Sequence, residues 1–179
     1  MKIENKWYVV QVRAGFEEQA CKLIERTEGV AELLHECFVP RYETMIHFRG
    51  QWVRRMRVLF PGYLIVVTAN VTELKTVLYK VPAFTRLLGG CEDCEGIMPL
   101  TNGEVAWMSA FTEEGERVIG MSEGVIEGDK IVILKGPLMN HVGWIKSINR
   151  RKRLAYLEMQ MFGRTIETKV GLGIIGRKP

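Results

Sequence analysis

The sequence predicts an α+β fold in two parts: an N-terminal antiparallel sheet flanked by helices, and a small C-terminal β-barrel. Strand and helix patterns alternate over residues 1–110 in the order β-α-β-β-β-α-β-α, whereas residues 128–179 contain strand patterns only. Between them, residues 111–127 hold five acidic residues, one arginine and three glycines, a composition typical of a flexible linker. We therefore expect domains at 1–110 and 128–179, joined by an acidic linker at 111–127.

Periodicity and turn residues define the N-terminal elements. Strands are expected where β-branched and aromatic residues concentrate, at 7–12, 38–48, 52–58, 63–67 and 84–88. Pro40 predicts that the second of these strands is bent or lies at an edge. Helices are expected between Gly15 and Gly29, over 71–80, and after Thr101, where Glu104 completes a capping box.

The C-terminal pattern predicts five short strands. They are expected at 130–134, 142–149, 154–161, 164–170 and 172–175. Their number and length suit a barrel of SH3-like size. Residues 151–161 are also rich in good helix formers, so a helical hairpin is the alternative. The turn residues between the strands favour the barrel.

Composition excludes several classes of protein, and charge is informative only when it is divided along the chain. The 179 residues are 47% hydrophobic and 26% charged with a net charge of +4, which argues against a disordered chain. Residues 1–110 are neutral and residues 111–127 carry −4. Residues 128–179 hold 11 basic and 3 acidic residues, a net of +8. The C-terminal domain is therefore expected to favour polyanions.

The densest basic cluster is Arg150–Arg153, which we expect to form the turn of a hairpin. Short charged runs are commonly solvated turns. Here, however, four cations follow one another with no acid among the five preceding residues, which favours contact with nucleic acid or phosphate.

Several kinds of chemistry are not expected. The longest apolar run, 63–67, is far shorter than the roughly 20 residues of a membrane helix, and nothing signals export, so we expect a cytoplasmic protein without a membrane anchor. Cys91 and Cys94 form a CxxC motif without a second ligand pair, so we expect ordinary thiols and no metal. No nucleophile elbow, HExxH or Walker motif is present, which argues against an enzyme and against a cofactor.

Two groups of motifs resemble a known family. Residues 128–138, followed by Gly143 and the apolar positions to 148, resemble the KOW motif, in which Gly143 is expected to allow close approach between strands. Residues 7–10, 38–40 and 60–64 resemble the NGN domain of the NusG family. The resemblance covers almost the whole chain in the family's order.

The resemblance implies a monomeric transcription elongation factor. Its NGN domain would bind the clamp helices of RNA polymerase through an apolar pocket, for which Tyr8, Phe60 and Tyr63 are the candidates. The alternative for each of these aromatic residues is a place in the core. Phe162 would be an exposed anchor for a protein partner such as ribosomal protein S10 or Rho, rather than a turn residue.

Departures from the general NusG pattern point to a specialised group. Residues 138–142 lack the usual phenylalanine and acid, and the turn at Arg150–Arg153 is more basic. Residues 151–172 are similar to the LoaP group of antiterminators, which implies that a structured leader RNA hairpin is read by the basic KOW face. The residues predicted to bind RNA are Lys146, Arg150, Arg151, Lys152, Arg153 and Arg164.

A second basic stretch lies on the expected N-terminal hairpin. It consists of Arg49, Arg54, Arg55 and Arg57 and could contact DNA or polymerase acids, or serve as a charged edge that prevents aggregation. Two other functions stay open for the whole chain. One is a general NusG that acts through protein partners, and the other is a KOW protein that binds ribosomal RNA.

Overall fold

The structure is a computed structural model that describes residues 3–89 and 96–178. The chain divides into two compact units. The first unit comprises Met1–Pro40 and Phe60–Ala106, and the second comprises Arg41–Leu59 and Trp107–Pro179. The segment 41–59, which the sequence places in the expected N-terminal domain, therefore belongs to the same compact unit as the C-terminal part of the chain.

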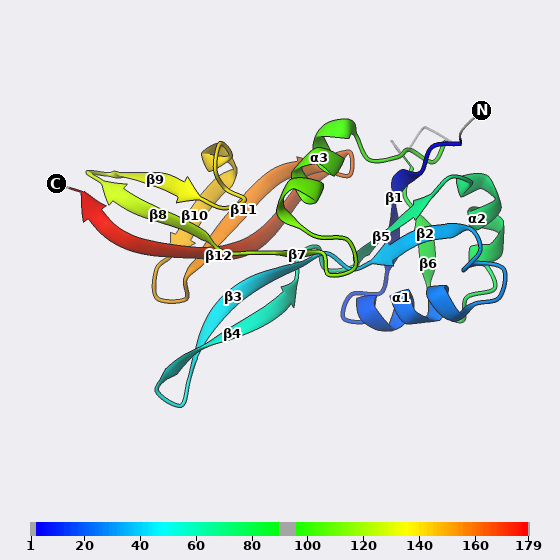
Figure 1. The fold of residues 1–179 in the computed structure, drawn as a ribbon, viewed down its shortest axis with the longest axis horizontal. Helices are drawn as coiled ribbons and strands as arrows, with labels where there is room; N and C mark the ends of the chain where they lie inside the picture. Colours follow the sequence, from blue (N-terminus) through cyan, green and yellow to red (C-terminus); the bar gives the residue numbers. More distant parts are fainter. Residues whose placement is uncertain (1–2, 90–95, 179) are drawn as a thin grey trace. The chain divides into compact units, whose positions relative to one another are not determined.

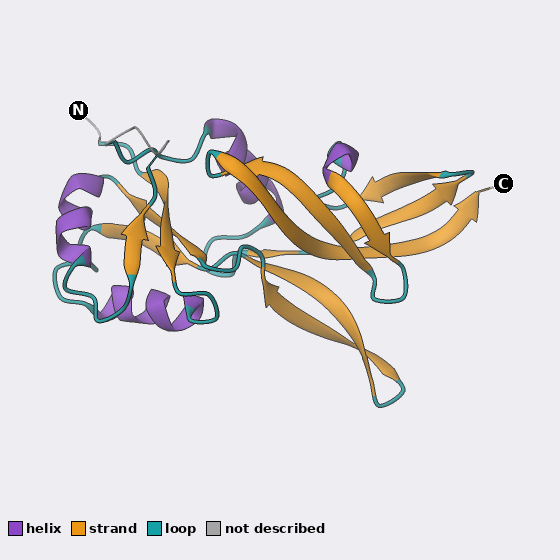
Figure 2. Cartoon of the chain, turned by 180° about the vertical axis from the view of Figure 1, so that it is seen from behind, coloured by secondary structure: helices purple, strands orange, loops and turns teal. Residues whose placement is uncertain are grey.

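The first unit is built on a four-stranded antiparallel sheet with the order β2-β5-β1-β6. Its strands are β1 (Lys6–Val12), β2 (Leu34–Phe38), β5 (Tyr63–Thr68) and β6 (Thr85–Leu87). The two central strands are almost wholly buried, with Val10, Leu64, Ile65 and Val66 at 0% exposure. Helices α1 (Glu17–Arg26) and α2 (Val71–Leu78) lie beside this sheet (Figures 1 and 2).

A side-chain hydrogen bond caps the start of α2. The Asn70 side chain accepts from the backbone N–H of Glu73 at 3.2 Å, which satisfies an N–H group that the helix start leaves without an intrahelical partner. Before α1, the Glu17 carboxylate accepts from the backbone N–H of Gly15 at 3.0 Å and so holds the turn that leads into the helix. Helix α3 (Asn102–Phe111) begins with the predicted capping box, in which Thr101 and Glu104 exchange hydrogen bonds of 2.7 and 3.2 Å.

The second unit contains a five-stranded sheet with the order β10-β11-β12-β8-β9. Its strands are β8 (Ser122–Glu127), β9 (Lys130–Lys135), β10 (Ile145–Asn149), β11 (Leu154–Met161) and β12 (Arg164–Lys178). A 3₁₀ turn, η1 (Val142–Trp144), precedes β10. The first half of β12 pairs with β11 and the second half pairs in parallel with β8, with a bulge between Ile174 and Gly176. Two expected strands are thus one long curved strand (Figure 1).

A three-stranded sheet, β4-β3-β7, completes the second unit. The hairpin of β3 (Arg41–Phe48) and β4 (Gln51–Val58) pairs in parallel with the short β7 (Val118–Ile119). β12 packs against β3 so closely that a Cβ atom at Gly171 would lie 2.5 Å from the Glu43 carbonyl oxygen. The Thr168 hydroxyl also donates to the Leu59 carbonyl oxygen.

The fold class is confirmed: the chain is α+β, with a helix-flanked antiparallel sheet near the N-terminus and a small five-stranded β structure at the C-terminus. The alternative of a helical hairpin at 151–161 is wrong, because residues Leu154–Met161 form strand β11. Several details differ from expectation. The expected strand at 38–48 is broken at Val39-Pro40 into β2 and β3, since proline cannot donate to the ladder.

The second difference concerns the expected linker at 111–127. This segment contains β7 and the whole of β8, whose Ser122, Val125 and Ile126 are buried. The predicted role of Gly143 also differs, because a Cβ atom there would meet nothing within 4 Å. The close approach occurs instead at Gly136, where φ is +102° and a Cβ atom would lie 2.6 Å from the Ser122 Cα.

Candidate nucleic-acid interface

The basic turn at Arg150–Arg153 joins β10 to β11 and is held by its own hydrogen bonds. The Asn149 side chain accepts from the backbone N–H of Lys152 at 2.9 Å, and the Arg153 N–H donates to the Arg150 carbonyl at 3.2 Å. The Arg153 carbonyl accepts from the Leu172 N–H at 2.9 Å, which attaches the turn to β12. These bonds hold the backbone of the turn and leave its cationic side chains at the surface.

The charge of this turn is not balanced by nearby acids. Arg150, Arg151 and Lys152 are exposed, and within the described residues none of them forms an ion pair with a carboxylate. Three such side chains on one short turn form a concentrated positive site that suits phosphate oxygens. These cations lie together on one hairpin turn, as expected for Arg150–Arg153, and their role in RNA binding stays a prediction.

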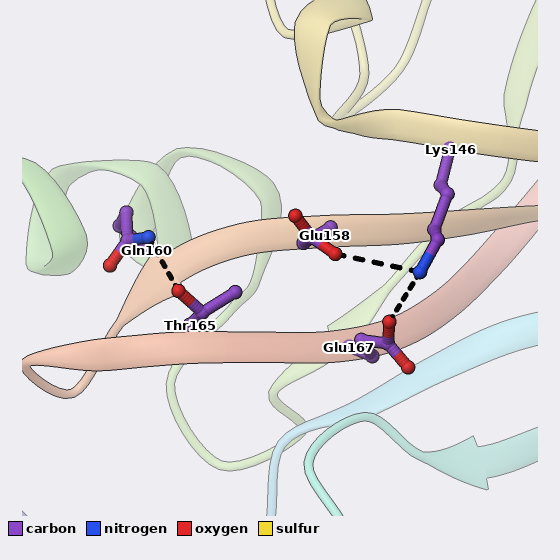
Figure 3. A network of polar contacts seen from close by, with 5 residues as sticks. All are labelled: Lys146, Glu158, Gln160, Thr165 and Glu167. Carbon is purple, nitrogen blue, oxygen red and sulfur yellow. Dashed lines mark hydrogen bonds and ion pairs between the residues drawn. The ribbon is translucent and has the colours of Figure 1, made fainter.

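Lys146 differs from the turn because two glutamates already hold it. Its Nζ atom lies 2.6 Å from a Glu167 oxygen and 3.5 Å from a Glu158 oxygen (Figure 3). The hydrogen bond to Glu167 and the two negative charges raise the pKa of Lys146, and the same bond lowers the pKa of Glu167. Glu158 and Glu167 stand directly opposite each other on β11 and β12, so Lys146 relieves the repulsion of a like-charged pair.

Arg164 lies at the far end of the hairpin from the basic turn. It opposes Met161 in the ladder, whereas the turn precedes Leu154 at the other end of β11. Seven residue steps along a strand span roughly 23 Å. Of the six residues predicted to bind RNA, the structure thus gathers four in the turn, places Lys146 in an ion-pair network and separates Arg164 from the rest.

The arginines of the β3–β4 hairpin are divided between its two faces. Residues directly opposite in an antiparallel pair share a face, and successive residues alternate. Arg54 shares a face with Trp52, and its Nε atom lies 3.2 Å from a Glu43 oxygen. Arg55 and Arg57 belong to the opposite face. Arg49, at the tip with φ +49°, stacks on the Phe48 ring with 5.2 Å between its Cζ atom and the ring centroid.

One contact joins the basic turn at Arg150–Arg153 to the β3–β4 hairpin, two segments that no motif in the sequence connects. The Arg153 Cζ atom lies 4.0 Å from the centroid of the Trp52 ring, a cation–π contact between the basic turn and the hairpin. Trp52 is 39% exposed, and its ring forms a T-shaped pair with the His47 ring, with 5.4 Å between the two centroids. Sequence reasoning missed Trp52. The only available signal was an aromatic residue next to Arg54 and Arg55 on an expected strand.

The aromatic residues predicted to face RNA polymerase lie in the first unit. Tyr8 is 8% exposed and Phe60 is 1% exposed, so both are buried, and burial raises the pKa of Tyr8. Tyr63, at the start of β5, is half-buried. The turn that precedes it is held by the buried Glu17 carboxylate, which accepts from the Gly62 N–H at 2.7 Å. Tyr63 is the one of the three that keeps part of its side chain at the surface.

The structure corrects the expectation for Phe162. Phe162 and Gly163 have φ values of +60° and +70° and form the two-residue turn between β11 and β12, in the geometry that right-twisted hairpins favour. Phe162 is only 7% exposed. It is therefore a buried turn residue and not an exposed anchor.

The cysteines form a pair that the sequence did not suggest. Cys21 on α1 and Cys37 on β2 are buried free thiols with sulfur atoms 3.3 Å apart. The hydrogen bond to Cys21, together with burial, raises the pKa of Cys37. Cys91 and Cys94 lie outside the described residues. Among the residues described, no cluster of three or more potential metal ligands occurs, and no helix has the length and apolarity to cross a membrane.

The chain is similar to known proteins over most of its length. Residues 5–109 match the family model NusG, described as transcription termination factor nusG. The transcription termination/antitermination protein NusG of Halalkalibacterium halodurans is 28% identical over 174 residues, covering 95% of this chain and 96% of the relative. The protein of the same name from Vibrio parahaemolyticus is 24% identical over 173 residues, covering 95% and 94%.

A solved structure, titled as the domain interaction in Thermotoga maritima NusG, is similar to this chain with a TM-score of 0.55. The two are 21% identical, and the match covers 96% of this chain and 95% of the other. At this identity the likeness concerns the fold, and it extends over both units.

Proposed function

Since the chain belongs to the NusG family of transcription termination and antitermination factors, we propose that it is an antiterminator that reads RNA. In this proposal the N-terminal domain, residues 1–110, binds the clamp helices of RNA polymerase. The basic C-terminal part binds a hairpin in the nascent leader RNA, in the manner of the LoaP group. The role is non-catalytic and cytoplasmic, and it promotes readthrough of terminators.

The observation that supports RNA binding is the uncompensated turn at Arg150–Lys152. Its three exposed cations lack carboxylate partners among the described residues, whereas Lys146 on the neighbouring strand is neutralised by two glutamates. A-form RNA is recognised mainly through its phosphates, its 2′-OH groups and its shape, and a rigid cationic turn suits that kind of contact. Arg153 extends the same positive surface to the β3–β4 hairpin. The hairpin arginines could add contacts with DNA.

The test compares two triple variants of the full chain. One replaces Arg150, Arg151 and Lys152 with alanine. The other removes the same charge from the first unit by replacing the exposed Lys22, Arg26 and Lys75. The probe is a stem-loop RNA titrated at several salt concentrations. Each lost phosphate contact should lower the salt slope by about one, so the turn variant should bind more weakly and with a flatter slope than wild type.

The control variant should keep the wild-type slope. Equal affinity and slope for the turn variant and wild type would overturn the RNA-reading proposal. The second candidate function would then stand, a general factor that acts through protein partners. It is favoured by the full-length similarity to termination/antitermination proteins from several bacteria.

A further inference from the structure

Trp52 is an exposed aromatic ring that no core packing requires. It lies on β4, an edge strand of the three-stranded sheet, and 39% of it is exposed. Met56, on the same face, is 48% exposed. A large aromatic side chain at such a position contributes little to the hydrophobic core, and part of its ring is accessible to a ligand.

Arg153 lies over this ring and has an uncommon backbone conformation. Its φ of +53° lies in the left-handed region, where residues other than glycine are uncommon. In that conformation the guanidinium covers the Trp52 ring at 4.0 Å, while the rest of the turn presents Arg150, Arg151 and Lys152 to solvent. An uncommon backbone conformation at a residue that joins an exposed ring to a cationic turn is the kind of feature that points to a binding role.

The exposed ring of Trp52 and the cations of the adjacent turn together suit one class of ligand. Proteins hold unpaired bases by stacking them on aromatic rings or on arginine guanidinium planes, while nearby cations bind the backbone. A continuous duplex keeps its bases stacked inside the helix and cannot offer one to Trp52. The ligand that uses both features is therefore an RNA stem with an unpaired base in its loop or in a bulge.

We propose that Trp52 and Arg153 form a stacking site for an unpaired base of the RNA bound by the basic turn. The base takes the position of the guanidinium over the indole, and the guanidinium moves to the phosphate of the same nucleotide. This inference rests on the proposed function and extends it, since it assigns to the β3–β4 hairpin the recognition of a base. The turn alone would recognise only the backbone.

The experiment uses the full chain and two RNA probes, a stem-loop with a purine-rich loop and the blunt duplex of the same stem. Trp52→Ala should bind the stem-loop about ten-fold more weakly than wild type and bind the duplex with unchanged affinity. Trp52→Phe should retain most of the stem-loop affinity because it keeps a ring. Met56→Ala, which removes an exposed apolar side chain from the same face, is the matched control and should behave as wild type.

Tryptophan fluorescence gives a second readout. A base stacked on the indole should quench the emission of Trp52, so the stem-loop should quench wild type more strongly than it quenches Trp52→Phe. Unchanged stem-loop binding by Trp52→Ala, with the turn still required, would overturn the stacking site and leave the proposed function standing. Failure of wild type to bind either RNA would overturn both. A Trp52→Ala defect confined to RNA polymerase binding would assign the ring to a protein partner and would also overturn the inference.

Discussion

Glu17 illustrates how a single buried carboxylate can hold two turns of the first unit. It is 4% exposed and accepts from the backbone N–H of Gly15 and of Gly62, at 3.0 and 2.7 Å. Glu17→Ala leaves both donors without this acceptor, which should reduce the free energy of unfolding by about 2 kcal/mol. Urea denaturation measures the loss. Glu25→Gln, an exposed change on the same helix, should have no measurable effect.

Lys146 neutralises two glutamates that face each other across β11 and β12. Lys146→Met leaves Glu158 and Glu167 facing each other across β11 and β12, so amides of this strand pair should exchange hydrogen faster at neutral pH. The folded state lowers the pKa of Glu167, so its stabilisation is present above the ordinary value of 4.5 and is lost as pH falls through the lowered value. The difference between variant and wild type should therefore shrink in acid.

A matched control for Lys146 is Lys135→Met. Lys135 pairs with Glu123 alone at 3.2 Å, and its loss creates no pair of facing acids. Exposed pairs of this kind contribute little. If Lys135→Met raised the hydrogen-exchange rate of the β11–β12 amides as much as Lys146→Met does, the role given to Lys146 would be contradicted.

At the scale of elements, the thiols of Cys21 and Cys37 connect α1 to β2. With sulfur atoms 3.3 Å apart, the pair should form an intramolecular disulfide when an azo oxidant such as diamide accepts its two electrons and two protons. The raised pKa of Cys37 disfavours the thiolate, so the reaction should be slow at neutral pH and faster in alkali. Closing a loop of this length should add about 3 kcal/mol to the stability of the first unit.

The measurement of this disulfide is the loss of two alkylatable thiols in a variant whose Cys91 and Cys94 are serine. Cys37→Ser in the same background is the control and should form no intramolecular bond. If the folded protein kept the thiols of Cys21 and Cys37 after prolonged oxidation in alkali, while the unfolded chain lost them, the short distance between the two sulfur atoms would be contradicted.

The elements also show which features a sequence can predict. Alternation and capping residues predicted β1, β4, β5 and all three helices, because those signals are local. β8 was missed because its glutamates and glycine interrupt the apolar pattern and because its buried residues, which include the adjacent Val125 and Ile126, do not alternate with exposed ones. In the candidate site, the cluster of cations in the turn could be predicted from the sequence, because its four residues are consecutive. The Arg153–Trp52 contact could not, since it depends on how β12 packs against β3.

At the scale of the whole molecule, the division of the chain into units bears on where the C-terminal domain begins. The sequence places its start at residue 128, after an acidic linker. In the structure, β8 lies between β12 and β9, and β9 pairs with no other strand among those described. β8 also holds the loop after β9, since the Ser122 hydroxyl accepts from the Leu138 N–H at 3.1 Å.

Removal of β8 should therefore unfold the C-terminal part. A fragment of residues 128–179 would lose the partner of β9 and the apolar side chains of Val125 and Ile126, which are 7% and 4% exposed. Burial of side chains of this size stabilises a fold by roughly 1.5–3 kcal/mol each, a large share of what so small a domain possesses. A fragment of residues 112–179 keeps β7 and β8 and should show dispersed amide resonances and a cooperative thermal transition, whereas 128–179 should show neither. Equal melting temperatures for the two fragments would mean that β8 is dispensable and that the linker extends to residue 127, as the sequence alone suggests.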